Sequence, residues 1–221
     1  MAKVLVVGGA GYIGSHMVRE LLAQGFTPTV LDNLSAGHRW ALPDGLLVEG
    51  DLRDRQLLDE LFVQGGFEAV LHFASSIQVG ESVVKPLKYY NNNVCTTINL
   101  LAAMERHGVK RFVFSSTAAV YGTPEQFPIS EDAPLHPENP YGRSKLMVEE
   151  MLMDCEVAWG LRSARLRYFN AAGADPAGGI GEAHNPETHL IPLILQVAAG
   201  RRTAITVNGA DYPTPDGTCI R

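Results

Sequence analysis

The sequence predicts an α/β fold in which a doubly wound parallel sheet is followed by an incomplete, smaller lobe. Two observations predict the sheet. Short runs rich in β-branched and aromatic residues alternate with longer segments of helical periodicity, as in strands joined by crossover helices. The runs are continuously apolar rather than alternating with polar residues, which is typical of strands covered on both faces. Right-handed crossovers would place helices on both sides of one sheet.

The predicted elements alternate along the first 170 residues. Each helix is expected to end near a glycine, because a left-handed residue commonly closes the last helical turn. Strands are predicted at 3–9, 27–32, 45–51, 68–74, 111–117 and 163–169, and helices at 12–24, 53–64, 83–107 and 140–159.

The chain changes character after about residue 170, where loops rich in Gly, Pro and Asn predominate. One amphipathic helix is predicted at 188–199, and a short apolar run at 204–207 favours a strand. A stable lobe normally needs more strands or helices than these. We therefore expect two domains, 1–170 and 171–221, of which the second is truncated and incomplete.

Composition narrows the class of protein. With 221 residues, 46% of them hydrophobic, the chain can bury a substantial core. Its net charge of -6, with scattered basic residues, argues against nucleic acid or a membrane as a partner. No signal peptide precedes the first strand, so a cytoplasmic protein is expected. The three cysteines and the histidines lack ligand spacing, so we expect neither disulfides nor a metal site.

A glycine-rich turn, "VVGGAGYIGSH", joins the first strand to the first helix. Gly8 allows the tight turn, and Gly11 lets the backbone approach a pyrophosphate at the N-terminus of the helix. Gly14 lets the helix lie close to the sheet. Such a turn between a strand and a helix predicts a Rossmann-type dinucleotide-binding domain over residues 1–170.

Acidic residues at the ends of the next two strands indicate which dinucleotide is bound. Asp32 ends the second strand, where a carboxylate accepts hydrogen bonds from an adenosine ribose and would repel a 2′-phosphate. NAD is therefore favoured over NADP. Asp51 and Leu52 follow the third strand and are candidates to flank the adenine, although a solvated turn explains them equally well.

The segment "NPYGRSKLMVEE" begins a helix and places Tyr141 and Lys145 four residues apart, on one face of its first turns. The fifth strand ends in "FSST", so Thr117 is expected at the same edge of the sheet. Oxidation of a secondary alcohol needs a base, and a free tyrosine, with a pKa of about 10, is protonated at neutral pH. We expect the Lys145 ammonium, together with the positive nicotinamide, to favour the phenolate of Tyr141, with Thr117 orienting the reacting oxygen.

These motifs resemble those of the extended short-chain dehydrogenase/reductases, which carry G-x-x-G-x-x-G and Y-x-x-x-K. The resemblance covers the whole chain, and its most specific parts are "VGESVVKPLKYYNNNV" and "LRYFNAAGA". It is strongest to the members that convert UDP-glucose and UDP-galactose into one another. These oxidise C4 of the UDP-hexose to a ketone with bound NAD and then reduce it on the opposite face. The resemblance also implies a homodimer.

The resemblance implies roles for individual residues. It implies Thr117, Tyr141 and Lys145 as the catalytic set, and Thr117, Tyr141, Asn170, His189, Leu190 and Arg221 as the residues that contact the UDP-sugar. It implies cofactor contacts from Gly8, Gly11, Tyr12, Ile13, Gly14, Asp32, Asn33, Asp51, Leu52, Phe73, Ala74, Asn92, Lys145 and Tyr168.

Two positions bear on the choice of reaction. Related dehydratases carry an Asp-Glu pair after the threonine, whereas this chain has Ala118 and Ala119, and a methyl group cannot move the protons that an elimination requires. Ile77 stands where some family members have a lysine beside the cofactor. The open alternatives are an epimerase or reductase for UDP-N-acetylglucosamine, UDP-glucuronate or UDP-xylose, and an inactive NAD-binding fragment.

Overall fold

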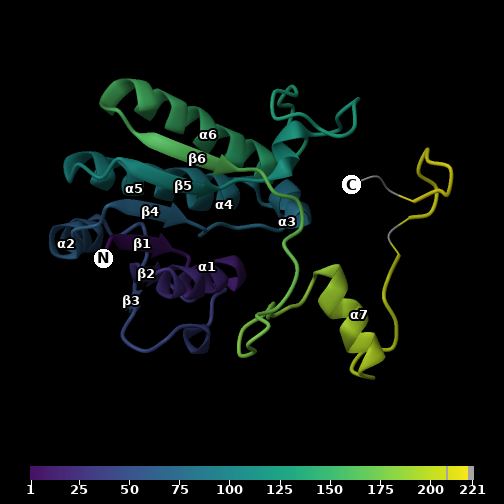
Figure 1. The fold of residues 1–221 in the computed structure, drawn as a ribbon. Helices are drawn as coiled ribbons and strands as arrows, with labels where there is room; N and C mark the ends of the chain where they lie inside the picture. Colours follow the sequence, from purple (N-terminus) through teal and green to yellow (C-terminus); the bar gives the residue numbers. More distant parts are fainter. Residues whose placement is uncertain (208, 219–221) are drawn as a thin grey trace. The chain divides into compact units, whose positions relative to one another are not determined.

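The computed structural model of the protein describes residues 1–207 and 209–218. It contains a parallel six-stranded sheet with the strand order β3-β2-β1-β4-β5-β6, which confirms the predicted fold class (Figure 1). The order reverses between β1 and β4, which is where a doubly wound sheet binds its ligand. The strands are β1 Lys3–Val7, β2 Thr27–Asp32, β3 Leu47–Glu49, β4 Ala69–His72, β5 Arg111–Ser115 and β6 Arg162–Leu166.

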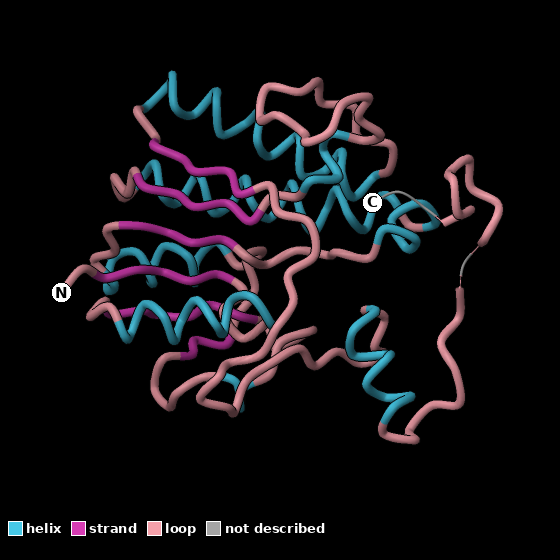
Figure 2. The backbone as a smooth tube through the Cα atoms, turned by 45° about the vertical axis from the view of Figure 1, so that its right-hand side comes forward, coloured by secondary structure: helices cyan, strands magenta, loops and turns pink. Residues whose placement is uncertain are grey.

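Helices of different lengths connect the strands, as the tube in Figure 2 shows. The longest, α6, begins where Asn139 caps its first turn by accepting from the backbone N–H of Gly142, and it ends at Gly160 in the left-handed conformation. The α-helices are α1 Tyr12–Ala23, α2 Arg55–Gly65, α3 Val79–Val84, α4 Pro86–Tyr89, α5 Thr96–Arg106, α6 Pro140–Trp159 and α7 Leu190–Ala198; the 3-10 helices are η1 Arg39–Ala41 and η3 Ala118–Tyr121, and η2 Tyr90–Cys95 is a π-helix.

Each face of the sheet buries its own apolar cluster. Residues of α2, α5 and α6, including Leu58, Met104 and Leu152, pack on one face. On the other face, Val18 and Leu21 of α1 pack against strand residues whose side chains point to that face, such as Val6 and Val30. Because successive side chains of a strand point to opposite faces, the continuously apolar strands supply both clusters. The packing holds the carboxyl ends of the strands, where the candidate site lies, on a rigid base.

Two predicted elements differ from the structure. The helix predicted at 83–107 is divided into α3, α4, η2 and α5, with a break before Pro86, whose nitrogen has no hydrogen to donate. The strand favoured at 204–207 is wrong, since these residues form neither strand nor helix. A short apolar run needs a neighbouring strand for its backbone hydrogen bonds, and the sequence alone does not provide one.

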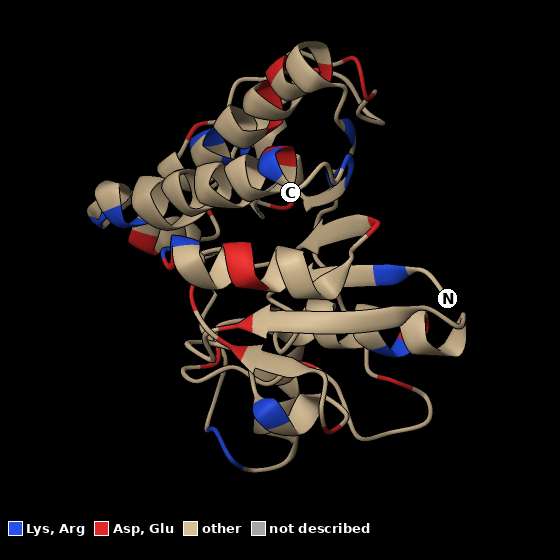
Figure 3. Cartoon of the chain, turned by 90° about the vertical axis from the view of Figure 1, so that its left-hand side faces the viewer, with Lys and Arg blue, Asp and Glu red and all other residues tan. Residues whose placement is uncertain are grey.

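The chain divides into two compact units, Met1–Gly181 and Glu182–Arg221. Among the described residues, the first unit contains the sheet and every helix except α7. The second unit contains α7, which has no buried residue, so this unit has little core of its own. No helix among the described residues is both long and apolar enough to cross a lipid bilayer. Lys, Arg, Asp and Glu are spread over many elements rather than gathered into a large region of one sign (Figure 3).

Candidate active site

The glycine turn after β1 has the close contacts that its sequence predicts. Gly8 has a φ of +78°, and a Cβ there would lie 2.4 Å from the backbone nitrogen of Ala74. A Cβ on Gly14 would lie 2.2 Å from the carbonyl oxygen of Gly8. A side chain at either position would therefore push the backbone apart, and glycine is required for the turn and for the approach of α1.

Gly11 differs from these two glycines. A Cβ at this position would have its nearest neighbour, the carbonyl oxygen of Gly8, at 3.4 Å, which is an ordinary contact. Gly11 caps α1 without a side-chain hydrogen bond, and the first turn of the helix carries no acidic residue. The backbone N–H groups at the N-terminus of a helix attract an anion, and the absent side chain of Gly11 leaves room for it. This geometry fits the pyrophosphate of a dinucleotide.

Asp32 is held firmly at the end of β2. Its two carboxylate oxygens accept hydrogen bonds from the backbone N–H groups of Ala10, at 2.9 Å, and Leu34, at 2.8 Å. The residue is buried, with 8% of its surface exposed. Each carboxylate oxygen has a second lone pair, so Asp32 can still accept from the hydroxyls of a ribose. Its backbone partners fix the direction in which it does so.

A polar network continues from Asp32 along the same edge of the sheet. Asn33 donates to Asp51 at 2.8 Å, and Arg53 contacts both Asp51, at 3.0 Å, and Asn92, at 3.3 Å. Burial raises the pKa of Asp51, but hydrogen bonds from the backbone of Arg53 and the side chain of Asn33, with the Arg53 charge, outweigh it and lower the pKa. Arg53 thus joins the Asn33–Asp51 pair to Asn92. The sequence analysis did not identify Arg53 as part of this network.

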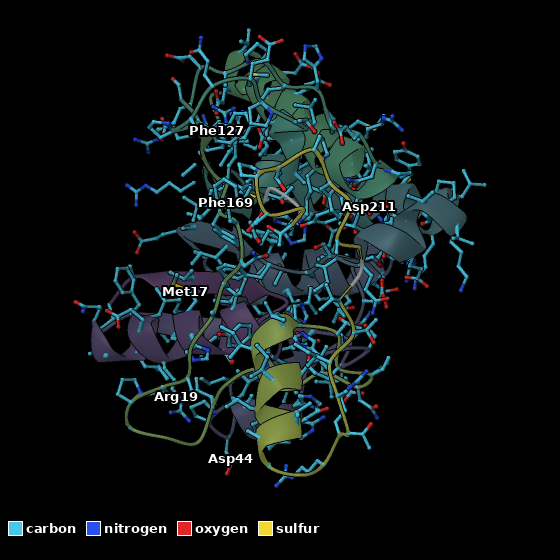
Figure 4. The ribbon with its side chains drawn as sticks, turned by 90° about the vertical axis from the view of Figure 1, so that its right-hand side faces the viewer. Met17, Arg19, Asp44, Phe127, Phe169 and Asp211 are labelled. Atoms are coloured by element: carbon cyan, nitrogen blue, oxygen red, sulfur yellow. The ribbon has the colours of Figure 1, made fainter. Side chains whose placement is uncertain are left out.

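The remaining predicted cofactor residues occupy three places. Leu52 is buried directly after Asp51, and Phe73 and Ala74 follow β4, with their N–H groups donating to the carbonyl of Val7. Ile13 lies in the first turn of α1. Tyr12 donates its hydroxyl to the carbonyl of Gly173 at 2.7 Å, and Arg19, which extends from α1 in Figure 4, pairs with Asp175 at 2.6 Å. The loop after β6 is therefore fastened to α1.

The candidate acid-base residues come together at the carboxyl end of β5. Thr117 follows that strand, caps η3 and forms a hydrogen bond with Tyr141 of α6. Nζ of Lys145 donates to the carbonyl of Ser115 at 2.8 Å, while Tyr168 shares a hydrogen bond with the Ser115 hydroxyl. Thr117, Tyr141 and Lys145 therefore lie on adjoining parts of one unit, as predicted.

The pKa of Tyr141 differs from our expectation. We expected Lys145 to lower it, but burial raises the pKa of Tyr141, with Tyr168 adding to that effect and the Thr117 hydrogen bond opposing it. Lys145 is itself buried. Burial lowers the pKa of Lys145 to about 7, although the negative charge of Glu149 acts in the opposite direction. At neutral pH such a lysine is only partly charged. The expectation also included the positive nicotinamide of the cofactor, whose charge favours the phenolate in addition to that of Lys145.

Two further residues, Glu149 and Arg167, support this site and were missed in the sequence. Glu149 of α6 is 1% exposed and accepts hydrogen bonds from Ser116 and Arg167. It lies one helical turn after Lys145, in the same "YGRSKLMVEE" segment, and its spacing could have indicated a shared face. Nothing in the sequence identifies Arg167 or Ser116 as its partners, because these contacts join α6 to residues that follow β5 and β6.

The residues expected to contact a UDP-sugar are distributed over both units. Asn170 is exposed in the first unit. In the second, Leu190 begins α7 with 64% of its surface exposed, and the ring of His189 pairs with Glu187 at 2.9 Å and Glu182 at 3.0 Å. Arg221 lies outside the described residues. Ile77, where some relatives have a lysine, is 44% exposed.

The second unit also contains a group of metal-ligand type that the sequence analysis did not expect. One ligand atom from each of Glu182, His184, Glu187 and His189 lies within 4.8 Å of the others. Burial raises the pKa of Glu182, against the charge of His189, and Glu187 adds to the rise. The imidazoles lie within ion-pair distance of both carboxylates.

Comparison with known proteins identifies the family of the chain. The chain belongs to the NAD dependent epimerase/dehydratase family, whose sequence profile matches residues 4–221. It is 56% identical to curated UDP-glucose 4-epimerases of Halalkalibacterium halodurans and Azospirillum brasilense. Each alignment covers 99% of this chain, but 65% and 63% of the respective relatives. The chain therefore spans about two thirds of their length.

Solved structures give the same result. The UDP-glucose 4-epimerase of Brucella ovis, in complex with NAD, superimposes with a TM-score of 0.95 at 52% identity over 99% of this chain and 67% of its own. The UDP-glucose 4-epimerase of Bifidobacterium longum, in complex with NAD+ and UDP, has a TM-score of 0.94 at 41% identity. The match covers 98% of this chain and 68% of that enzyme's chain.

Proposed function

We propose that the chain carries the cofactor-binding and acid-base parts of an enzyme that interconverts UDP-glucose and UDP-galactose. The observation that carries this proposal is the convergence of Thr117, Tyr141 and Lys145 at the carboxyl end of β5, on the same sheet edge as the glycine turn and Asp32. The curated relatives at 56% identity are named UDP-glucose 4-epimerases, which supports the same reaction.

The residues that we assign to NAD fit that cofactor. The open first turn of α1 would hold the pyrophosphate, and Asp32 would accept from the adenosine ribose. The network of Asn33, Asp51 and Asn92 extends the site along the sheet edge. When bound, NAD supplies the acceptor and donor of the C4 hydride. The other assigned residues are Gly8, Tyr12, Ile13, Gly14, Leu52, Phe73, Ala74, Lys145 and Tyr168.

The protein's own part in the chemistry is the movement of one proton. Tyr141 takes the proton of the C4 hydroxyl and returns it to the same oxygen. Thr117 orients that oxygen through its hydroxyl, and the Lys145 ammonium stabilises the phenolate. Because burial raises the pKa of Tyr141, nearby positive charge is needed for it to act as a base. We assign Asn170, His189, Leu190 and Arg221 to the UDP end of the substrate, which anchors it while the sugar turns.

The test is to incubate the purified chain with UDP-galactose and measure UDP-glucose formation. We expect conversion that Tyr141→Phe reduces by roughly 10²- to 10⁴-fold, the usual contribution of a positioned general base. Tyr212→Phe, which removes a hydroxyl from the second unit, serves as the control. Retained NAD without any conversion would instead identify the chain as an inactive NAD-binding fragment.

A second candidate is epimerisation of other nucleotide sugars. A solved structure that is 43% identical to this chain, from Campylobacter jejuni, is described as a UDP-Glc/GlcNAc 4-epimerase. Related proteins of this fold thus accept an N-acetylated sugar. Comparing turnover of UDP-galactose with that of UDP-N-acetylglucosamine, UDP-glucuronate and UDP-xylose discriminates the two candidates, because a strict enzyme converts only the first.

We further propose a cytoplasmic homodimer. Cys95 and Cys155 carry free thiols, which suits a reducing compartment. Side chains of α5 and α6 such as Ile98, Met153 and Val157 expose apolar surface, with Val157 90% exposed, and support pairing with a second copy. Analytical ultracentrifugation of the chain and of Val157→Glu tests the dimer, which the variant should weaken.

A further inference from the structure

A buried ion pair lies behind the candidate acid-base residues. Glu149, 1% exposed, accepts from Nε of Arg167 with both carboxylate oxygens at 3.1 Å, and its Oε1 also accepts from the Ser116 hydroxyl. Arg167 follows β6 and donates in turn to the hydroxyl of Tyr121 at 2.9 Å. The pair thus connects α6 with the ends of β5 and β6, where residues 115–117 carry the site.

Glu149 lies one turn beyond Lys145 on the same buried face of α6. Lys145 is 2% exposed, and its Nζ has the carbonyl of Ser115 at 2.8 Å and the ring of Phe114 at 4.9 Å. Both contacts accommodate a positive charge. They do not supply the full negative charge that a buried ammonium needs as compensation.

Among the titratable groups around Lys145, Glu149 is the one whose negative charge raises the pKa of Lys145. His72, from β4, has its pKa lowered to about 3 by burial, with Lys145 as a second cause, so it is neutral at physiological pH. Tyr141, from α6, is a neutral phenol in its resting state, as is Tyr89, from α4, which packs edge-on against it. Tyr168, beyond β6, also has a raised pKa. Arg167 is positive and pairs with Glu149.

We propose that Glu149 is a positioning residue that favours the charged form of Lys145 against the effect of burial. Resting on the proposed function, this role explains how a buried lysine still serves a tyrosine base. Arg167 and Ser116 hold the carboxylate in place, and Arg167 limits how strongly its charge acts on Lys145. Removal of the Glu149 charge should release the Lys145 proton at lower pH, because burial would then act without opposition.

The test is a pH titration of lysine side chains by ¹³C NMR, which needs neither NAD nor substrate and so does not depend on the proposed function. Lys145 is distinguished from Lys3, Lys85, Lys88 and Lys110, all exposed, by the loss of its signal in Lys145→Arg. In Glu149→Gln, we expect the pKa of Lys145 to fall at least one unit below its value in the unmodified chain. Glu150→Gln, which removes the same charge from the exposed neighbouring position, should leave it unchanged.

The direction of the shift separates the proposal from a purely structural role. Loss of packing around Lys145 would admit water and raise its pKa, so a rise or no change in Glu149→Gln overturns the proposal. If that variant does not fold, Arg167→Met and Arg167→Lys decide. Arg167→Met leaves the Glu149 charge unopposed and should raise the pKa of Lys145, whereas Arg167→Lys retains the charge and should not. Equal shifts in both would show disruption and contradict the proposal.

Discussion

The helices α6 and α7 show how differently the two units use apolar sequence. α6 has charged and polar residues among its apolar ones, yet it buries Lys145, Glu149, Val148 and Leu152 against the sheet. α7 reads "LIPLILQVA" and is far more apolar, yet none of its described residues is buried, and Leu195 is 61% exposed. Apolar sequence alone does not position a helix; the surface that it packs against does.

This difference has a functional consequence. The residues that we assign to proton transfer and to NAD lie in the first unit, where packing and hydrogen bonds fix them. Of the residues assigned to the substrate, His189 and Leu190 lie in the second unit, where α7 provides no buried anchor. Changes in the first unit should therefore affect folding and cofactor binding strongly, and equivalent changes in the second should affect them little.

The largest expected effect comes from matched leucines of the two helices. Leu152→Ala removes a fully buried side chain from α6 and should lower the free energy of unfolding by about 2–5 kcal/mol. Leu195→Ala in α7 removes a largely exposed side chain and should change it by less than about 0.5 kcal/mol. Urea unfolding curves measure both values. Equal losses would mean that α7 is as well packed as α6, and the comparison would fail.

A glycine pair tests whether the backbone of the first unit is already shaped for NAD. Gly14→Ala places a Cβ 2.2 Å from the carbonyl oxygen of Gly8, so α1 must move away from the turn. We expect NAD to bind at least about 10-fold more weakly, which is about 1.4 kcal/mol. Gly80→Ala in α3 meets nothing within 4 Å and is the control. Calorimetric titration with NAD that finds both variants equal to the unmodified chain would disprove the role of the turn.

The acid sensitivity of the protein should also originate in the first unit. The pKa of His72 is lowered from 6.5 to about 3 in the folded state, so the unfolded chain binds a proton more readily between these values. Folding stability is therefore complete above about pH 6.5 and falls as pH decreases, by up to about 1.4 kcal/mol per pH unit. Urea midpoints from pH 7 to pH 4 should fall less steeply in His72→Gln. The exposed His136→Gln should behave as the unmodified chain does; a reduced slope there would argue against His72.

The smallest effect is expected in the second unit. Burial raises the pKa of Glu187, but hydrogen bonds with the backbone and ring of His189 outweigh it and lower the pKa overall. Its contribution to stability is thus present above the ordinary glutamate pKa and is lost as pH falls through the lowered value. Glu187→Gln should cost less than about 1 kcal/mol at pH 7, and thermal melts at pH 7 and pH 4 measure it. A larger loss would show that the cluster organises this unit.

Much of the fold could be predicted from the sequence because it depends on local patterns. Continuous apolar runs identified all the strands of the sheet, and the glycine spacing located the turn at Gly8 and Gly14. Pro86 could have been read as a helix break, and it was overlooked within a long helical pattern. The favoured strand at 204–207 failed because a strand depends on a partner elsewhere in the chain.

The proximity of the candidate site residues could be predicted from the sequence, but their electrostatics could not. The spacing of Tyr141 and Lys145 placed them on one helix face, and strand order brought Thr117 to them. The raised pKa of Tyr141 and the lowered pKa of Lys145 could not be predicted, because both follow from burial. The link from Glu149 to Arg167 joins residues on different elements, so no local pattern indicates it.

We expect the first unit to contain the complete cofactor site. The most direct test is calorimetric titration of NAD into the unmodified chain and into a variant of the second unit, His189→Gln with Leu190→Ala. Both proteins should bind one NAD per chain with dissociation constants that agree within about twofold. An unmodified chain that does not bind NAD, or a 10-fold loss of affinity in the variant, would contradict it.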